Sequence, residues 1–176
     1  MDRTESLIDQ FRAQPPESDK RRELVAGVSG ILADRPDHPA ALPFLASVTE
    51  DTEEYELARI EAATALRMWP PTDDAHRQRA ARALLAVMRG PDEDLVRQYV
   101  AMALGPYADD PEIHDAMAAA VLFDEDQLVR DNALAALSHA GPSDGRAEVL
   151  HRLADDRTLG REAARILTAW GLGPAV

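Results

Sequence analysis

Histidines are the side chains in this chain best suited to bind a metal ion or transfer a proton. Five occur, at His38, His76, His114, His139 and His151. None stands in the His-Glu-x-x-His order that places two metal ligands on one helix face. Only His114, with Asp110 and Glu112 nearby, could offer one imidazole and two carboxylates to a metal. The alternative is that all five are exposed histidines on helix surfaces.

Other catalytic and ligand-binding patterns are missing from the sequence. The chain contains no cysteine, which excludes disulfides, thiolate zinc sites and a cysteine nucleophile. The acidic runs at 49–56, 107–112 and 123–127 lack the order of a calcium-binding loop, and helix capping explains them. No nucleophile elbow, P-loop or Gly-x-Gly-x-x-Gly occurs. We therefore predict no enzyme, no catalytic residue, no cofactor and no metal site.

Arginines recur at a nearly regular interval and are the remaining candidates for a shared role. Four similar stretches can be aligned on Arg59, Arg97, Arg130 and Arg161, at spacings of 38, 33 and 31 residues. The two closest copies read DLVRQYVAMAL and QLVRDNALAAL. A near-constant period in this range is typical of stacked helical repeats, in which one hairpin cannot bury its own apolar face.

The segments that carry these arginines have the spacing of amphipathic helices. Val96, Val100 and Leu104 fall on one helix face, as do Val129, Ala133 and Leu137. Gly-Pro pairs at 90–91, 105–106 and 141–142 signal helix ends, and the acids that follow suit helix starts. No segment alternates with the period of a strand, and alanine is abundant while aromatic residues make up only 5%.

These signals for helix ends and helix starts divide the chain into ten expected helices, which pair as five hairpins. The expected pairs are 4–13 with 19–33, 39–49 with 54–68, 73–89 with 93–105, 110–122 with 126–139, and 144–154 with 157–170. The repeated element, an acidic turn followed by Leu-Val-Arg and then small residues with Ala-Leu, resembles the HEAT-like repeat in its short form, found in phycobilin-lyase-type and bacterial HEAT-like proteins. This resemblance covers about 51–171 and implies an all-α, right-handed α-solenoid of about five antiparallel hairpins.

The arrangement of one repeat leads to expectations for individual side chains. Each Leu-Val pair is expected to enter the core. Arg59, Arg97, Arg130 and Arg161 are expected to form a structural ladder, with Arg97 and Arg130 paired to carboxylates among Asp92, Asp94, Asp124 and Asp126. An anion-binding role for these arginines is the alternative. Residues 1–176 are expected to form one domain, in which 1–50 are a possible N-terminal cap.

Arrays of this kind usually bind through a concave face formed by the second helices of the hairpins. Counting from each arginine, positions +1, +2 and +5 should face that side. The partner-binding candidates selected in this way are Glu61, Thr64, Gln98, Tyr99, Met102, Asp131, Asn132 and Glu162; Ile60, Ala135, Ala163 and Ile166 fall at the same positions. This set is neutral to acidic, which suits a protein or peptide better than phosphates. Plain solvated helix surface is the alternative.

Charge narrows the possible partners. With 32 acidic and 19 basic residues, the net charge is −13, which disfavours nucleic acid and anionic membranes and favours a basic partner. The predicted function is a non-enzymatic protein-interaction scaffold in the cytoplasm, without a membrane segment. Two alternatives follow from the resemblance: a HEAT-like DNA glycosylase, which presents a basic concave face with aromatics, and a chromophore-lyase-like chaperone.

Overall fold

The computed structural model describes residues 2–173, and this range contains ten α-helices, one short 3-10 helix and no strand. The α-helices are α1 (Arg3–Arg12), α2 (Asp19–Asp34), α3 (Ala41–Glu50), α4 (Glu56–Met68), α5 (Asp74–Arg89), α6 (Asp94–Ala103), α7 (Pro111–Phe123), α8 (Gln127–Ala140), α9 (Asp144–Arg152) and α10 (Gly160–Ala169). The 3-10 helix η1 spans Gly105–Tyr107. Met1 and residues 174–176, which the predicted domain includes, lie outside the described residues.

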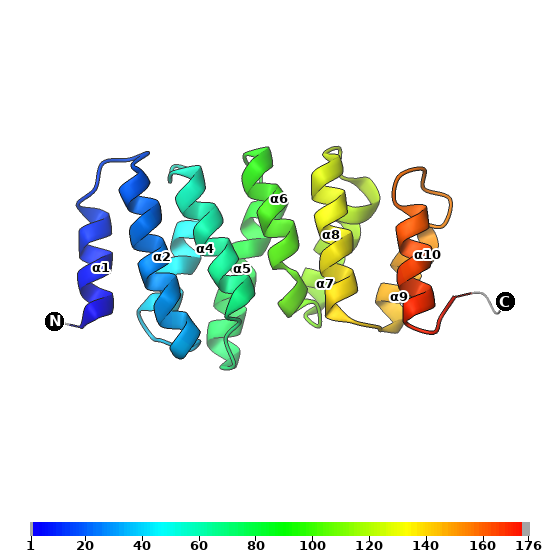
Figure 1. Ribbon diagram of the computed structural model, residues 1–176, viewed down its shortest axis with the longest axis horizontal. Helices are drawn as coiled ribbons and strands as arrows, with labels where there is room; N and C mark the ends of the chain where they lie inside the picture. Colours follow the sequence, from blue (N-terminus) through cyan, green and yellow to red (C-terminus); the bar gives the residue numbers. More distant parts are fainter. Residues whose placement is uncertain (1, 174–176) are drawn as a thin grey trace.

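Consecutive helices form five antiparallel hairpins that stack side by side, as Figure 1 shows from α1 to α10. The second helices α2, α4, α6 and α8 pack against one another, and the first helices α3, α5, α7 and α9 do the same behind them. The architecture is an α-solenoid, which confirms the predicted fold class and the five predicted pairs. No helix among residues 2–173 is long and apolar enough to cross a bilayer.

Local sequence explains where the helices begin and end. Asp73, Asp110 and Asp126 are N-caps whose carboxylates accept backbone N–H groups of the first turn. Gly141, between α8 and Pro142, has φ = 83°, a left-handed conformation that glycine adopts without steric cost. The Gly-Pro pair at 105–106 behaves differently, because it lies within η1 instead of directly ending a helix.

The core confirms the predicted apolar faces but corrects the role of the Leu-Val pairs. Val96 and Val129 are completely buried, whereas the preceding Leu95 and Leu128 remain 38% and 54% exposed. Adjacent residues on an α-helix point about 100° apart, and the buried faces of α6 and α8 begin at Val96 and Val129, which leaves Leu95 and Leu128 just outside them. Small side chains line the contacts between second helices; Ala58, Ala62, Ala101 and Ala133 are all fully buried.

A ladder of ion pairs joins the hairpins along the edge that is uppermost in Figure 1. Each rung links a second-helix arginine to an acid in the turn of the next hairpin. The four rungs are Arg21–Glu54, Arg59–Asp92, Arg97–Asp124 and Arg130–Asp156. Three of these arginines were expected from the sequence, but the partner of Arg130 is Asp156, outside the four acids considered.

Arg59 shows how a rung holds two hairpins together. Its guanidinium is 1% exposed and donates two hydrogen bonds to the Thr49 carbonyl oxygen at the end of α3. Its Nη1 also donates to Asp92 Oδ1, 2.7 Å away, in the turn between α5 and α6. Arg130 repeats the pattern with the Val121 carbonyl oxygen and Asp156. The guanidinium thus satisfies orphan carbonyls of its own hairpin and a carboxylate of the next.

Arg161 does not continue the ladder. It is exposed and forms no ion pair within residues 2–173. The buried residues of α10 place Gly160, not Arg161, at the position of the ladder arginines. A Cβ on Gly160 would lie 2.7 Å from the Ala154 carbonyl oxygen, so close packing against the end of α9 requires glycine there.

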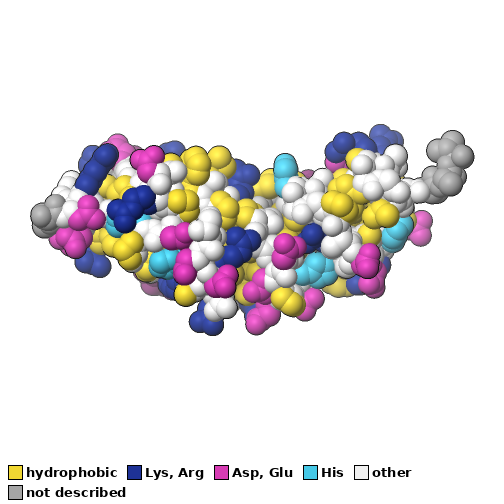
Figure 2. Space-filling view, turned by 90° about the horizontal axis from the view of Figure 1, so that it is seen from below, with side chains coloured by type: hydrophobic (Ala, Val, Ile, Leu, Met, Phe, Trp, Pro, Cys, Tyr) yellow, Lys and Arg dark blue, Asp and Glu magenta, His cyan; other side chains and the backbone are white. Residues whose placement is uncertain are grey.

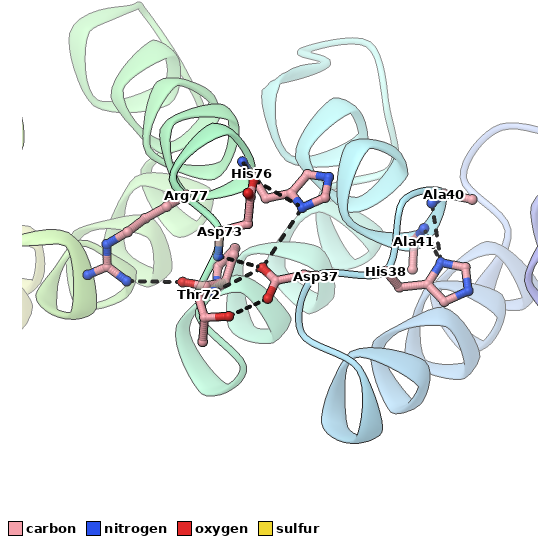
Figure 3. Close-up of polar contacts among 9 residues, drawn as sticks. Asp37, His38, Ala40, Ala41, Thr72, Asp73, His76 and Arg77 are labelled. Atoms are coloured by element: carbon pink, nitrogen blue, oxygen red, sulfur yellow. Dashed lines mark hydrogen bonds and ion pairs between the residues drawn. The ribbon is translucent and has the colours of Figure 1, made fainter.

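The opposite edge is joined by side chains of the loops between hairpins (Figure 3). Asp37 accepts hydrogen bonds from the backbone N–H groups of Thr72 and Asp73, both at 2.9 Å, and from the Thr72 hydroxyl. The buried His38 accepts the N–H groups of Ala40 and Ala41 at Nδ1 and therefore serves as a cap for α3. These contacts fix the loops that position the second helices.

Candidate functional site

The surface of the second helices carries an apolar stripe that the core does not use. On α6, Leu95, Tyr99 and Met102 follow the i, i+4, i+7 spacing of one helix face. Leu95 and Tyr99 are 38% and 48% exposed, and Met102 is half-buried. Leu128, at the start of α8, has the position that Leu95 has on α6 and is 54% exposed. We call Leu95, Tyr99, Met102 and Leu128 the apolar stripe.

Exposed acids flank the upper end of the apolar stripe. Glu93 is the N-cap residue of α6 and Asp94 its first residue; Glu125 lies in the turn before α8, and Asp131 lies in the first half of α8. None of the four forms an ion pair among the described residues. An apolar surface with uncompensated carboxylates beside it suits apolar side chains that have lysine or arginine neighbours.

Two of the predicted partner-binding residues join α6 to α8. Gln98 donates to Asp126 Oδ2 at 2.7 Å, and Asn132 donates to the Gln98 carbonyl oxygen at 2.9 Å. The Gln98 hydrogen bond is the main reason that the pKa of Asp126 lies below its ordinary value. Both amides are half-buried, so they hold the two helices that carry the stripe in register.

The remaining predicted residues lie at the surface in different settings. Glu61 is half-buried, and its carboxylate is 3.9 Å from Arg22 of α2. Thr64 is half-buried on α4, beside the stripe helix α6. Asp131 is exposed and accepts a hydrogen bond from Gln127. Tyr99 and Met102 belong to the apolar stripe.

The last hairpin departs from the predicted register. Ala163 and Ile166, assigned to the concave surface, are 0% and 2% exposed and belong to the core. With Gly160 as the reference position, the outward residues are Arg161, Glu162 and Arg165. Glu162 pairs with Arg165 on the same helix, which holds the pKa of Glu162 below its ordinary value. The alignment on Arg161 was therefore one residue out of register.

The conceivable metal site around His114 is not assembled. Asp110 caps α7 by accepting the N–H groups of Glu112 and Ile113, and the Glu112 side chain pairs with Arg89 of α5. Over residues 2–173, no three His, Cys, Asp or Glu side chains are grouped in a way that could hold a metal ion.

A family model for HEAT repeats matches residues 81–169, about half of the chain. The chain belongs to the HEAT-repeat family. The matched region runs from α5 to α10 and includes the apolar stripe and two of the four ladder arginines. A search of curated proteins found no match to this chain.

Among solved structures, human deoxyhypusine hydroxylase in complex with glycerol is similar to this HEAT-repeat chain. The identity is 18%, the match covers 96% of this chain and 90% of that one, and the TM-score is 0.41. The sequence-based expectation that the protein is not an enzyme is contradicted by this similarity to an enzyme, and we withdraw it. Because the TM-score is low, nothing of the hydroxylase's activity is transferred to this chain.

Sequence reasoning missed Leu95 and Leu128, the exposed leucines of the HEAT-repeat stripe. Both were assigned to the core as members of the Leu-Val pairs. The helical rotation of about 100° per residue was the available signal, because it separates Leu95 from Val96 on the helical wheel. The buried Arg146 was also missed; it donates to the Gly141 and Ala108 carbonyl oxygens and pairs with Asp109.

Proposed function

We propose that this HEAT-repeat protein is a scaffold that binds a segment of another protein across α6 and α8. The apolar stripe is the observation that carries the proposal. Three side chains, Leu95, Tyr99 and Leu128, remain between 38% and 54% exposed although their own helices have well-filled core faces. Single exposed apolar residues are ordinary, but an aligned group on neighbouring helices is typical of an interaction surface.

The rigid support of the stripe favours the same proposal. Gln98 and Asn132 join α6 to α8, and the Arg97–Asp124 rung joins the same hairpins at the upper edge. A surface held in this way loses little conformational freedom when a partner binds, which improves affinity.

Charge indicates the kind of segment that would bind. Glu93, Asp94, Glu125 and Asp131 lie beside the stripe, and the whole chain has a net charge of −13. The segment should therefore present apolar anchors with lysine or arginine next to them. Such complementarity mainly increases the association rate and weakens as salt is added.

Peptide selection from a random displayed library would test the proposal, because a random library samples many sequences and does not require an identified partner. The library is first depleted on a Leu95→Ser/Tyr99→Ser double variant and then selected on the wild-type protein. Recovered peptides should share apolar residues flanked by lysine or arginine. Their affinity should fall at least about tenfold in the double variant and decrease at high salt.

Phe123→Ser supplies the matched control. Phe123 is 70% exposed but lies outside the stripe, under the guanidinium of Arg152. The selected peptides should bind this variant as they bind the wild type. Equal affinity for the double variant and the wild type, or selection of acidic peptides, would refute the proposal.

A further inference from the structure

A pocket lies at the lower end of the second helices, where α6 is shorter than its neighbours. α6 ends at Ala103, whereas α4 and α8 continue to Met68 and Ala140. The chain leaves α6 through η1, and Gly105 passes so close to α8 that an added Cβ would lie 3.3 Å from the Ala136 carbonyl oxygen. This detour leaves a pocket of about 420 Å³ between α4 and α8.

Figure 2 views the molecule from this lower end, where apolar side chains lie among arginine, acidic and histidine side chains. The pocket has an apolar wall that includes Met68, Met102 and Ala136. Met68 is 51% exposed although it ends a core helix. Methionine side chains adapt to different apolar shapes, and the volume is in the range of small-ligand sites.

Arg67 supplies a cation to this pocket that the protein itself does not use. Its side chain is half-buried, and among residues 2–173 its guanidinium makes no hydrogen bond and no ion pair. The planar donors of Arg67 are therefore free for a carboxylate.

His139 adds a hydrogen-bond acceptor on the opposite side. Its Nδ1 lies 2.8 Å from the Ala135 carbonyl oxygen, which can only accept, so Nδ1 carries the proton. In the neutral ring, Nε2 is then an acceptor. Asp109 also lines the pocket, but its carboxylate is 91% exposed and pairs with Arg146 Nη1 at 3.2 Å.

We propose that this pocket binds an apolar amino acid whose amino group is acylated and whose carboxylate is free. Arg67 receives the carboxylate, Nε2 of His139 accepts the amide N–H, and the apolar side chain lies against Met68 and Met102. A peptide C terminus and a free N-acyl amino acid share this chemistry. The site is separate from the proposed function, because only Met102 belongs to both surfaces.

Calorimetric titration with N-acetyl-L-leucine tests the site, with N-acetyl-L-leucinamide as the ligand that lacks the charge. The wild type should bind the acid saturably and the amide at least about tenfold more weakly. Arg67→Gln should remove that preference. Arg82→Gln, an identical change on the exposed surface of α5, should leave it intact, as should Tyr99→Ser on the apolar stripe.

A peptide ending in leucine, with a free or an amidated C terminus, identifies the source of the ligand. Tighter binding of the free peptide than of N-acetyl-L-leucine supports a protein C terminus, and equal binding supports a free N-acyl amino acid. If Arg67→Gln does not fold, His139→Phe replaces it, because His139 is exposed, and should weaken acid binding. Equal binding of acid and amide to the wild type, or no saturable binding of either acid or free peptide, would overturn the proposal.

Discussion

At the scale of single residues, the ladder shows how a charge can be buried in a small helical repeat. Arg59 and Asp92 have side chains only 1% and 3% exposed. Their removal from water is offset because the guanidinium also binds the Thr49 carbonyl oxygen. A buried pair of this kind is costly to break from one side, since the remaining ion keeps its desolvation penalty without its partner.

Replacing one member of that pair should therefore be strongly destabilising. We expect Asp92→Ala to lower the free energy of unfolding by about 3–5 kcal/mol, measured by urea denaturation. Glu162→Ala, which breaks the exposed Glu162–Arg165 pair, should change it by no more than about 0.5 kcal/mol. Similar losses in the two variants would show that the ladder has no special role.

The last rung predicts a pH dependence. The pKa of Asp156 is held below its ordinary value, first by a hydrogen bond from the Leu159 backbone N–H and second by Arg130. A carboxyl whose pKa is lower in the folded state stabilises the fold at pH values above the pKa that the same carboxyl has in the unfolded chain, about 4. That stabilisation is lost as the pH falls toward the folded pKa.

Asp156→Asn should consequently be less stable than the wild type by about 1–3 kcal/mol at neutral pH. Urea midpoints measured from pH 7 down to pH 3 should show a constant difference at first and a shrinking one below about pH 4. A difference that grows as the pH falls would contradict the assignment.

At the scale of elements, the junction between α9 and α10 depends on a residue without a side chain. Gly160 stands where the other second helices have their ladder arginine, and its Cα faces the Leu153 and Ala154 carbonyl oxygens. At this end of the described array, the close packing of the start of α10 against the end of α9 takes the place of the missing ion pair. α10 begins at Gly160 itself, whereas α4, α6 and α8 each begin three residues before their ladder arginine.

Gly160→Ala should destabilise the protein by about 1–3 kcal/mol, because the new Cβ would be 2.7 Å and 2.9 Å from two backbone oxygens. Gly30→Ala is the matched control. Gly30 lies within α2 with nothing within 4 Å of an added Cβ, so the change should stabilise by about 0.5–1 kcal/mol. Thermal unfolding of the two variants would reveal the opposite signs; a stabilising effect at 160 would refute the proposed packing.

At the scale of the whole molecule, the acidic charge is expected to disfavour nucleic acid as a partner. A net charge of −13 on 176 residues repels phosphate backbones at any distance that salt does not screen. Three of the arginines that could offset this charge, Arg59, Arg97 and Arg130, are partly or fully buried in ion pairs.

Duplex DNA should therefore not bind this protein. Fluorescence anisotropy of a labelled duplex at low salt should show no saturation at protein concentrations up to about 10 µM. A heat-denatured sample controls for nonspecific changes in signal. Tight binding with a steep salt dependence would instead support the glycosylase-like alternative considered from the sequence.

The helices, their pairing and the family can all be predicted from the order of the amino acids. They follow from short-range physics: helical spacing places Val96 and Val100 on one face, while Gly141 and the capping acids mark the boundaries. The period of the arginines predicts a repeat, because a regular spacing along the chain becomes a regular stack in space.

Which side chains remain free depends instead on how the helices pack. Whether Arg130 reaches Asp126 or Asp156, for example, depends on the offset between hairpins. The pocket beside Arg67 exists because α6 ends before its neighbours do, a difference visible only when the three helices lie side by side. Binding surfaces depend on such relative placements, because exposure is a property of the packed assembly and not of the local sequence.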